Sequence, residues 1–140
     1  MADRGRNVLA QVPLFDDLSP RHLKRLAERM EEQRYMEGAP VVRYGEEGDT
    51  FYVIVEGEAD VVSPDGRVVA TLRPGEFFGE ISLLDGGPRT ASVVAATPLL
   101  MLALSRSAFR QMIEVEPRVA VGLLKHAAQL LRRLERPASG

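Results

Sequence analysis

The first regular pattern of apolar and polar positions lies near the N-terminus. Ser19 is a favourable N-cap residue, and Pro20 suits the first position of a helix. The apolar side chains that follow recur at the spacing of one helix face, at Leu23, Leu26, Ala27 and Met30. The pattern predicts an amphipathic helix that begins at Pro20, with the short apolar segment 12–15 packed against it.

Between residues 38 and 98 the pattern changes to short apolar runs separated by turn residues. Glycine or proline recurs every few positions, and the runs between them are rich in β-branched and aromatic residues. Many short strands bounded by turns are typical of a β-barrel or sandwich. Pro64-Asp65-Gly66 is a hairpin signal between two of the runs. The strands are expected at 41–42, 51–55, 59–62, 68–72, 91–94 and 99–104.

Two further helices are predicted after the strands. Residues 107–115 can form a short helix that buries its apolar side chains, and a longer helix is expected to start at Pro117 and to end between Pro137 and Gly140. The apolar residues of the longer helix follow heptad spacing, at Ala120, Leu124, Ala127, Leu131 and Leu134. This stripe suits either a dimeric coiled coil or packing on the domain's own roll, and we favour the second interpretation.

The predicted fold is mainly β, an antiparallel β-roll or jelly-roll barrel with an N-terminal helix and two C-terminal helices. The 140 residues fit one domain. We divide it into an N-terminal helical part (1–32), a roll (33–105) and C-terminal helices (106–136).

Composition and charge exclude several classes of function. The chain has no cysteine, which excludes disulfides, thiolate metal sites and a cysteine nucleophile. Its two histidines, His22 and His126, lie in predicted helices and not on strands, so no metal or other cofactor is expected. The net charge of −2 lacks the basic surplus that is typical of nucleic-acid-binding domains. No apolar stretch approaches the roughly 20 residues of a membrane helix, so we expect a cytoplasmic protein.

One stretch, residues 75–91, departs from ordinary strand sequence. A helical turn is expected near Gly79, where the missing side chain lets a ligand approach the backbone. The amides of Ile81 and Ser82 would then be free donors at a helix N-terminus, which favours an anion.

Two charged residues complete this picture. Arg89 follows a Gly-Gly-Pro loop and offers a planar fork that suits two phosphate oxygens. Glu80 is out of place beside an anion unless it accepts a hydrogen bond from a sugar hydroxyl of the same ligand. A phosphate site, a sugar site and apolar walls together indicate a nucleotide.

The stretch from Gly75 to Val93 resembles the phosphate-binding cassette of the cyclic nucleotide-binding domain family, which includes kinase regulatory subunits, cyclic nucleotide-gated channels and bacterial activators. The run F-G-E-I-S-L-L and the P-R-T-A after it match the family pattern without a gap. Residues 45–54 and 57–61 resemble the early β-roll of the family. The resemblance covers most of the chain, and it implies a sensor that binds a cyclic mononucleotide and is not an enzyme. We favour cAMP over cGMP as the ligand, and Thr90 does not decide between them.

The resemblance also implies roles for matching positions. Glu80 would bind the ribose 2′-hydroxyl, and Arg89 would bind the cyclic phosphate with Asp60 steadying the arginine. The backbone amides of Ile81, Ser82 and Thr90 would complete the phosphate site. Gly79 and Ala91 would also belong to the ligand-binding residues.

Other matching positions would surround the base. The apolar wall that faces it would be Val61, Val69 and Leu72. The last helix would supply a lid, for which the candidates are Leu130, Leu131, Arg132 and Arg133.

Signalling is expected to follow from two states of the domain. Ligand would draw the cassette inward, and the helices after Arg106 would repack over it. The chain stops at Gly140, so no helix-turn-helix DNA-binding domain is expected after the last helix. The signal would pass to a protein partner, a parent protein or a second copy of the chain.

Two other interpretations stay open. One is a scaffold or dimerisation module of the same fold that binds no nucleotide. The other is a hydrolase of cyclic nucleotides, which lacks evident metal ligands and a nucleophile in this sequence.

Overall fold

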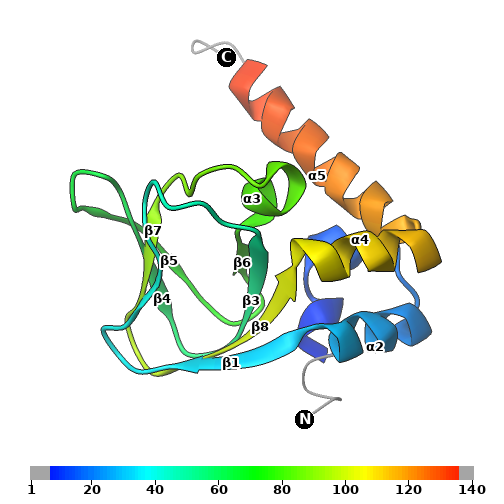
Figure 1. The fold of residues 1–140 in the computed structure, drawn as a ribbon, viewed down its shortest axis with the longest axis horizontal. Helices are drawn as coiled ribbons and strands as arrows, with labels where there is room; N and C mark the ends of the chain where they lie inside the picture. Colours follow the sequence, from blue (N-terminus) through cyan, green and yellow to red (C-terminus); the bar gives the residue numbers. More distant parts are fainter. Residues whose placement is uncertain (1–6, 136–140) are drawn as a thin grey trace.

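Two antiparallel four-stranded sheets form one side of the molecule in the computed structural model, and most of the helices gather on the other side (Figure 1). The model describes residues 7–135, apart from the side chains of Ile81, Leu84, Leu134 and Glu135. The first sheet has the strand order β1-β8-β3-β6, and the second has the order β2-β7-β4-β5. The predicted mainly β fold with flanking helices is therefore confirmed, with two facing sheets in place of a closed barrel.

The strands of the first sheet are β1 (Glu31–Tyr35), β3 (Thr50–Glu56), β6 (Phe77–Phe78) and β8 (Leu99–Ser105). Those of the second sheet are β2 (Pro40–Val42), β4 (Ala59–Val62), β5 (Val68–Leu72) and β7 (Ser92–Ala95). The helices are the 3-10 helix η1 (Pro13–Phe15), then α2 (Pro20–Arg29), α3 (Glu80–Asp85), α4 (Arg106–Val115) and α5 (Arg118–Glu135). All six predicted strands are present, and the predicted hairpin turn joins β4 to β5.

Two strands were not predicted. β1 lies at the edge of the first sheet, and its side chains are mostly exposed and charged, so the sequence carries no apolar alternation there. β1 begins at Glu31, before the predicted start of the roll. β6 has two residues, which is too short for any pattern.

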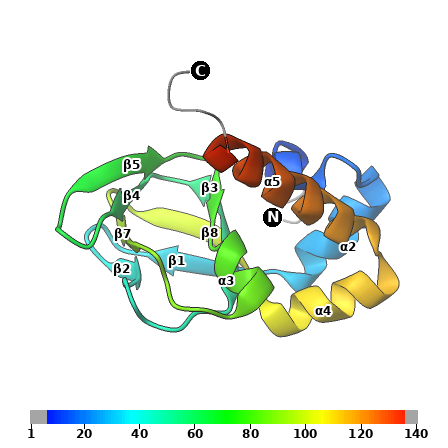
Figure 2. The ribbon, with the colours of Figure 1, turned by 90° about the horizontal axis from the view of Figure 1, so that it is seen from above.

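The two central strands of the first sheet divide the core into two clusters. One face of β3 and β8 packs against the helices through Phe51, Val53, Leu100, Leu102 and Leu104. The opposite face packs against the second sheet through Tyr52, Ile54, Leu99, Met101 and Ala103. Because both faces are covered, these strands are continuous apolar runs in the sequence. Figure 2 shows the helices on one side of this sheet and the second sheet on the other.

Helices α2 and α4 begin at capped residues. The Ser19 side chain accepts a hydrogen bond from the amide of His22, as the predicted N-cap of α2 requires. Helix α4 is capped by Ser105, whose side chain accepts from the amide of Ala108, so it starts at Arg106 and slightly before the predicted position.

Helix α5 packs on η1 and α4 through a face that the heptad pattern did not predict. Val119 and Leu123 are buried, and a Cβ on Gly122 would lie 1.7 Å from the backbone oxygen of Leu14. The predicted inward stripe is wrong, because Leu124 is 70% exposed and Leu131 is 58% exposed. The Leu134 side chain and the predicted end of the helix lie outside the described residues.

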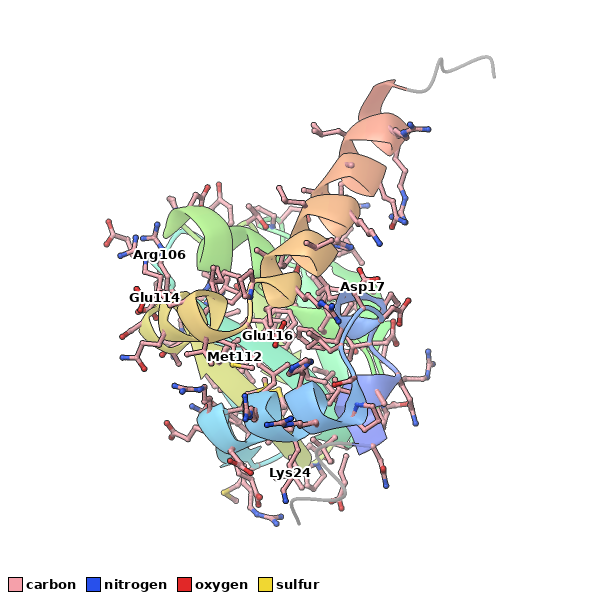
Figure 3. All side chains as sticks on the ribbon, turned by 90° about the vertical axis from the view of Figure 1, so that its right-hand side faces the viewer. Asp17, Lys24, Arg106, Met112, Glu114 and Glu116 are labelled. Atoms are coloured by element: carbon pink, nitrogen blue, oxygen red, sulfur yellow. The ribbon has the colours of Figure 1, made fainter. Side chains whose placement is uncertain are left out.

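Two polar contacts fasten the start of α5 to the N-terminal helical part. His22 Nε2 lies 2.7 Å from Glu116 Oε2, and Lys125 Nζ lies 2.9 Å from Asp17 Oδ2. Figure 3 labels Asp17 and Glu116 near the first turns of α5, from which the rest of the helix extends away from the body of the molecule.

Candidate ligand-binding site

Helix α3 begins at a glycine whose backbone and surroundings both exclude a side chain. Gly79 has a φ of 91°, in the left-handed region that favours glycine. A Cβ there would lie 2.5 Å from the backbone oxygen of Thr50 and 3.0 Å from Arg89 Nη1. The first amide hydrogen bond of the helix runs from Leu83 N to Gly79 O. The amides of residues 80–82 precede it and therefore lack a helical acceptor.

Arg89 is a buried cation beside this turn. The residue is 7% exposed, and its Nη1 donates a hydrogen bond of 3.1 Å to the backbone oxygen of Thr50. Its own backbone is held on both sides, because Arg89 N donates to Glu46 O and Gly45 N donates to Arg89 O. Among the residues that the structure describes, no carboxylate forms an ion pair with Arg89.

The side chain of Arg89 crosses the backbone of Gly48. A Cβ on Gly48 would lie 2.0 Å from Arg89 Nε and 2.3 Å from Cζ, far inside ordinary contact. The glycine therefore leaves the space that the guanidinium fills. Gly48 was not among the predicted site residues, although it lies within the segment that resembles the early β-roll.

Tyr52 forms the aromatic side of the arginine's environment. Arg89 Cζ lies 6.0 Å from the centroid of the Tyr52 ring, which stacks on Phe78 with 4.9 Å between centroids. Burial, followed by the nearby Tyr35, raises the pKa of the Tyr52 phenol above its ordinary value, so the group stays neutral beside the cation. The sequence argument did not single out Tyr52.

A cavity of about 160 Å³ opens between α3 and the second sheet. It brings together an arginine, a carboxylate and apolar walls, from Val42, Val61, Phe78, Gly79, Glu80, Ser82, Arg89, Thr90, Ala91 and Val93. Seven of the predicted site residues lie among them. Such a cavity can accept an anion at the guanidinium, a hydroxyl at the carboxylate and an apolar group at the walls.

Two predicted base-facing residues do not line this cavity. Val69 is 57% exposed on β5, at the edge of the second sheet. Leu72 is partly buried and packs against the core between the sheets. Of the three predicted positions only Val61 lies at the cavity, because β4 is the inner strand of this hairpin.

Asp60 is not in contact with Arg89. Its Oδ1 accepts a hydrogen bond of 2.9 Å from Thr71 Oγ1, directly across the β4–β5 pair. Successive side chains of a strand point to opposite faces, so Asp60 and its neighbour Val61 do not share the cavity. The expected support of Arg89 by Asp60 is absent from this arrangement.

The predicted lid residues also lie away from the roll cavity. Leu131 and Arg132 are exposed, whereas Leu130 and Arg133 line a second cavity of about 570 Å³ on the helix side of the cassette. Glu80 lines this second cavity as well as the first.

The described part of the chain has neither a metal-binding cluster nor a membrane-spanning helix. No group of three or more histidine, aspartate or glutamate side chains there could hold a metal ion. No described helix combines the length and the apolar character needed to cross a membrane.

Comparison with protein families gives a match over most of the roll. The model described as cyclic nucleotide-binding domain matches residues 32–116. The cAMP-dependent protein kinase regulatory subunit of Colletotrichum orbiculare is 39% identical over 106 residues, which are 75% of this chain and 27% of the relative. The CRP-like cAMP-activated global transcriptional regulator of Mycobacterium tuberculosis is 32% identical over 130 residues, which are 90% of this chain and 58% of the relative.

Solved structures show the same likeness in three dimensions. The N-terminal domain of a transcriptional regulator from Streptomyces coelicolor superposes with a TM-score of 0.81 at 37% identity, covering 91% of this chain and 92% of that one. The catabolite activator protein of Thermus thermophilus gives a TM-score of 0.81 at 35% identity, covering 88% of this chain and 60% of that one.

The fold and the cavity thus define a β-roll domain whose cavity suits a small anionic ligand. The chain belongs to the cyclic nucleotide-binding domain family. It spans 27% and 58% of the length of the two curated relatives named above.

Proposed function

We propose that this chain is a regulatory sensor domain that binds a cyclic mononucleotide, cAMP more readily than cGMP, and does not transform it. The names of the relatives support cAMP, since they are a cAMP-dependent kinase subunit and a cAMP-activated regulator. A solved structure named as cAMP-bound PfPKA-R is also similar, with a TM-score of 0.75 at 25% identity.

The observation that carries the proposal is the state of Arg89. A buried cation is unfavourable unless an opposite charge or hydrogen bonds compensate it. Arg89 has one carbonyl partner, and none of the described carboxylates pairs with it. A cyclic phosphate in the adjoining cavity would supply both the negative charge and the acceptors for its remaining N–H groups.

The other cavity residues suit the rest of such a ligand. Glu80 is placed to accept a hydrogen bond from a ribose hydroxyl, and the amides of residues 80–82 can donate to phosphate oxygens. Val61 and Val93 offer an apolar wall to the base. The response would be a repacking of α4 and α5 that is passed to a protein partner or parent protein in the cytoplasm.

Calorimetric titration with cAMP, cGMP and 5′-AMP tests the proposal. We expect micromolar or tighter binding of a cyclic nucleotide and weaker binding of 5′-AMP. The affinity for the cyclic nucleotide should fall in both Arg89→Ala and Glu80→Ala. Arg73→Ala is the control, because this exposed arginine pairs with Glu58 and not with the cavity. A folded wild-type protein that binds neither cyclic nucleotide would refute the proposal.

A second candidate is a scaffold that acts through protein contacts without nucleotide. It is favoured by the exposed apolar residues of α5, Leu124 and Leu131. Sedimentation velocity of the wild type and of Leu124→Lys tests it. Self-association that the substitution abolishes, in a protein with no cyclic nucleotide affinity, would support this alternative.

A further inference from the structure

Helix α5 reaches the cassette through His126. His126 Nε2 lies 3.5 Å from Glu80 Oε1, and each side chain is 20% exposed. The imidazole also packs edge-on against Phe77, with 5.4 Å between ring centroids. Within the described part of the chain, the buried Nε2 atom has no hydrogen-bond partner, and the Glu80 carboxylate is the acidic group that lies within ion-pair distance of it.

Glu80 lies between two cavities and can meet a different hydrogen-bonding partner in each. On the roll side it faces the cavity that contains Arg89 and Ser82. On the helix side it faces the cavity lined by His126, Arg133 and Glu76. A ribose hydroxyl on the roll side and the imidazole on the helix side would then share the negative charge of one carboxylate, so each partner would weaken the contact of the other.

We propose that His126 competes with the ligand for the Glu80 carboxylate, so that α5 lowers nucleotide affinity and nucleotide binding frees the distal part of α5 to repack. This inference rests on the proposed function. Coupling between two contacts is reciprocal: if the ligand weakens the His126–Glu80 contact, then that contact weakens ligand binding by the same factor. The competition is specific to a ligand that needs Glu80.

The position of the competing residue suits such a release. The first turns of α5 are fixed by buried Val119 and Leu123 and by the Lys125–Asp17 pair. His126 follows directly, and Leu131 beyond it is exposed. Loss of the imidazole–carboxylate contact would therefore free the distal part of the helix while its base stays in place.

His126→Phe separates the polar contact from packing, because the ring against Phe77 is retained and Nε2 is removed. We expect the Kd for cAMP to fall about two- to fivefold, the range of a partly exposed polar pair. The Kd for 2′-deoxy-cAMP should not change, since this analogue lacks the hydroxyl from which Glu80 would accept a hydrogen bond. In the Glu80→Gln background the His126→Phe substitution should have no effect on cAMP affinity. His126→Leu, which also lacks a hydrogen-bonding group, is the second variant should the phenylalanine disturb the fold.

Proton NMR adds a readout that packing alone would not move. The chain has two histidines, so the ring signals of His126 are those that His126→Phe removes. They should shift on saturation with cAMP and stay in place with 2′-deoxy-cAMP. An unchanged Kd for cAMP in both His126 variants would overturn the competition while leaving the proposed function intact. An equal gain in affinity for cAMP and for 2′-deoxy-cAMP would do the same. A wild type that binds no cyclic nucleotide would instead refute the proposed function.

Discussion

Replacement of Gly48 by alanine should separate ligand binding from folding. The new Cβ would lie 2.0 Å from Arg89 Nε, whereas ordinary contact begins at about 3.5 Å. The guanidinium must therefore move by about 1.5 Å, which exceeds the tolerance of a charge-assisted hydrogen bond. Loss of one such bond costs about 1.5–3 kcal/mol, which raises the Kd for a cyclic nucleotide roughly 10- to 150-fold.

The fold should tolerate the same change. Gly48 has an ordinary φ, so alanine introduces no backbone strain there. The clashing atoms belong to the flexible side chain of Arg89 and can shift, at an overpacking cost of about 1 kcal/mol. The melting temperature should therefore change by only a few degrees.

Calorimetry with the cyclic nucleotide and thermal unfolding measure the two effects. Gly66→Ala is the matched control, because it lies in the β4–β5 hairpin with a φ of 87° and nothing within 4 Å of its Cβ. It should destabilise the fold by about 1 kcal/mol through backbone strain and leave the Kd unchanged. Wild-type affinity in Gly48→Ala would refute the argument that Arg89 binds the ligand from its present position.

Three further changes have distinct expected outcomes. Gly122→Ala meets the backbone oxygen of Leu14, which cannot move aside, so unfolding should become easier by about 1–3 kcal/mol and hydrogen exchange of α5 should rise. Asp60→Ala removes the acceptor of Thr71; chemical denaturation should show a loss of about 1 kcal/mol, with less than a threefold change in Kd. Burial raises the pKa of the Tyr52 phenol, so its neutral form stabilises the fold below pH 10, and this contribution is lost at higher pH. In Tyr52→Phe the free energy of unfolding, measured by denaturation above pH 10, should therefore fall less steeply with pH than in the wild type.

The elements that could be predicted from the sequence are those whose buried faces produce a regular pattern of apolar positions. β8 is apolar from Leu99 to Leu104 because the helices cover one of its faces and the second sheet covers the other. β1 carries no such signal, because most of its side chains are exposed and it joins the sheet mainly through backbone pairing with β8. The prediction that the heptad stripe of α5 packs inward was wrong because heptad spacing identifies an apolar face and not what covers that face. The face that packs contains Gly122, where the closest backbone approach leaves no apolar side chain to detect.

The site residues also fall into those that a local sequence pattern predicts and those that only the fold brings together. Glu80 and Arg89 could be predicted together because a short continuous segment carries both, with Gly79 setting the turn between strand and helix. Gly48 and His126 reach these two residues from segments far away in the sequence, and only the fold brings them into contact. The cassette therefore defines which groups can meet a nucleotide, whereas residues outside it hold those groups in position or compete for them. Two chains with identical cassettes need not share one affinity, and in this chain the residue at position 126 is where we expect that difference to arise.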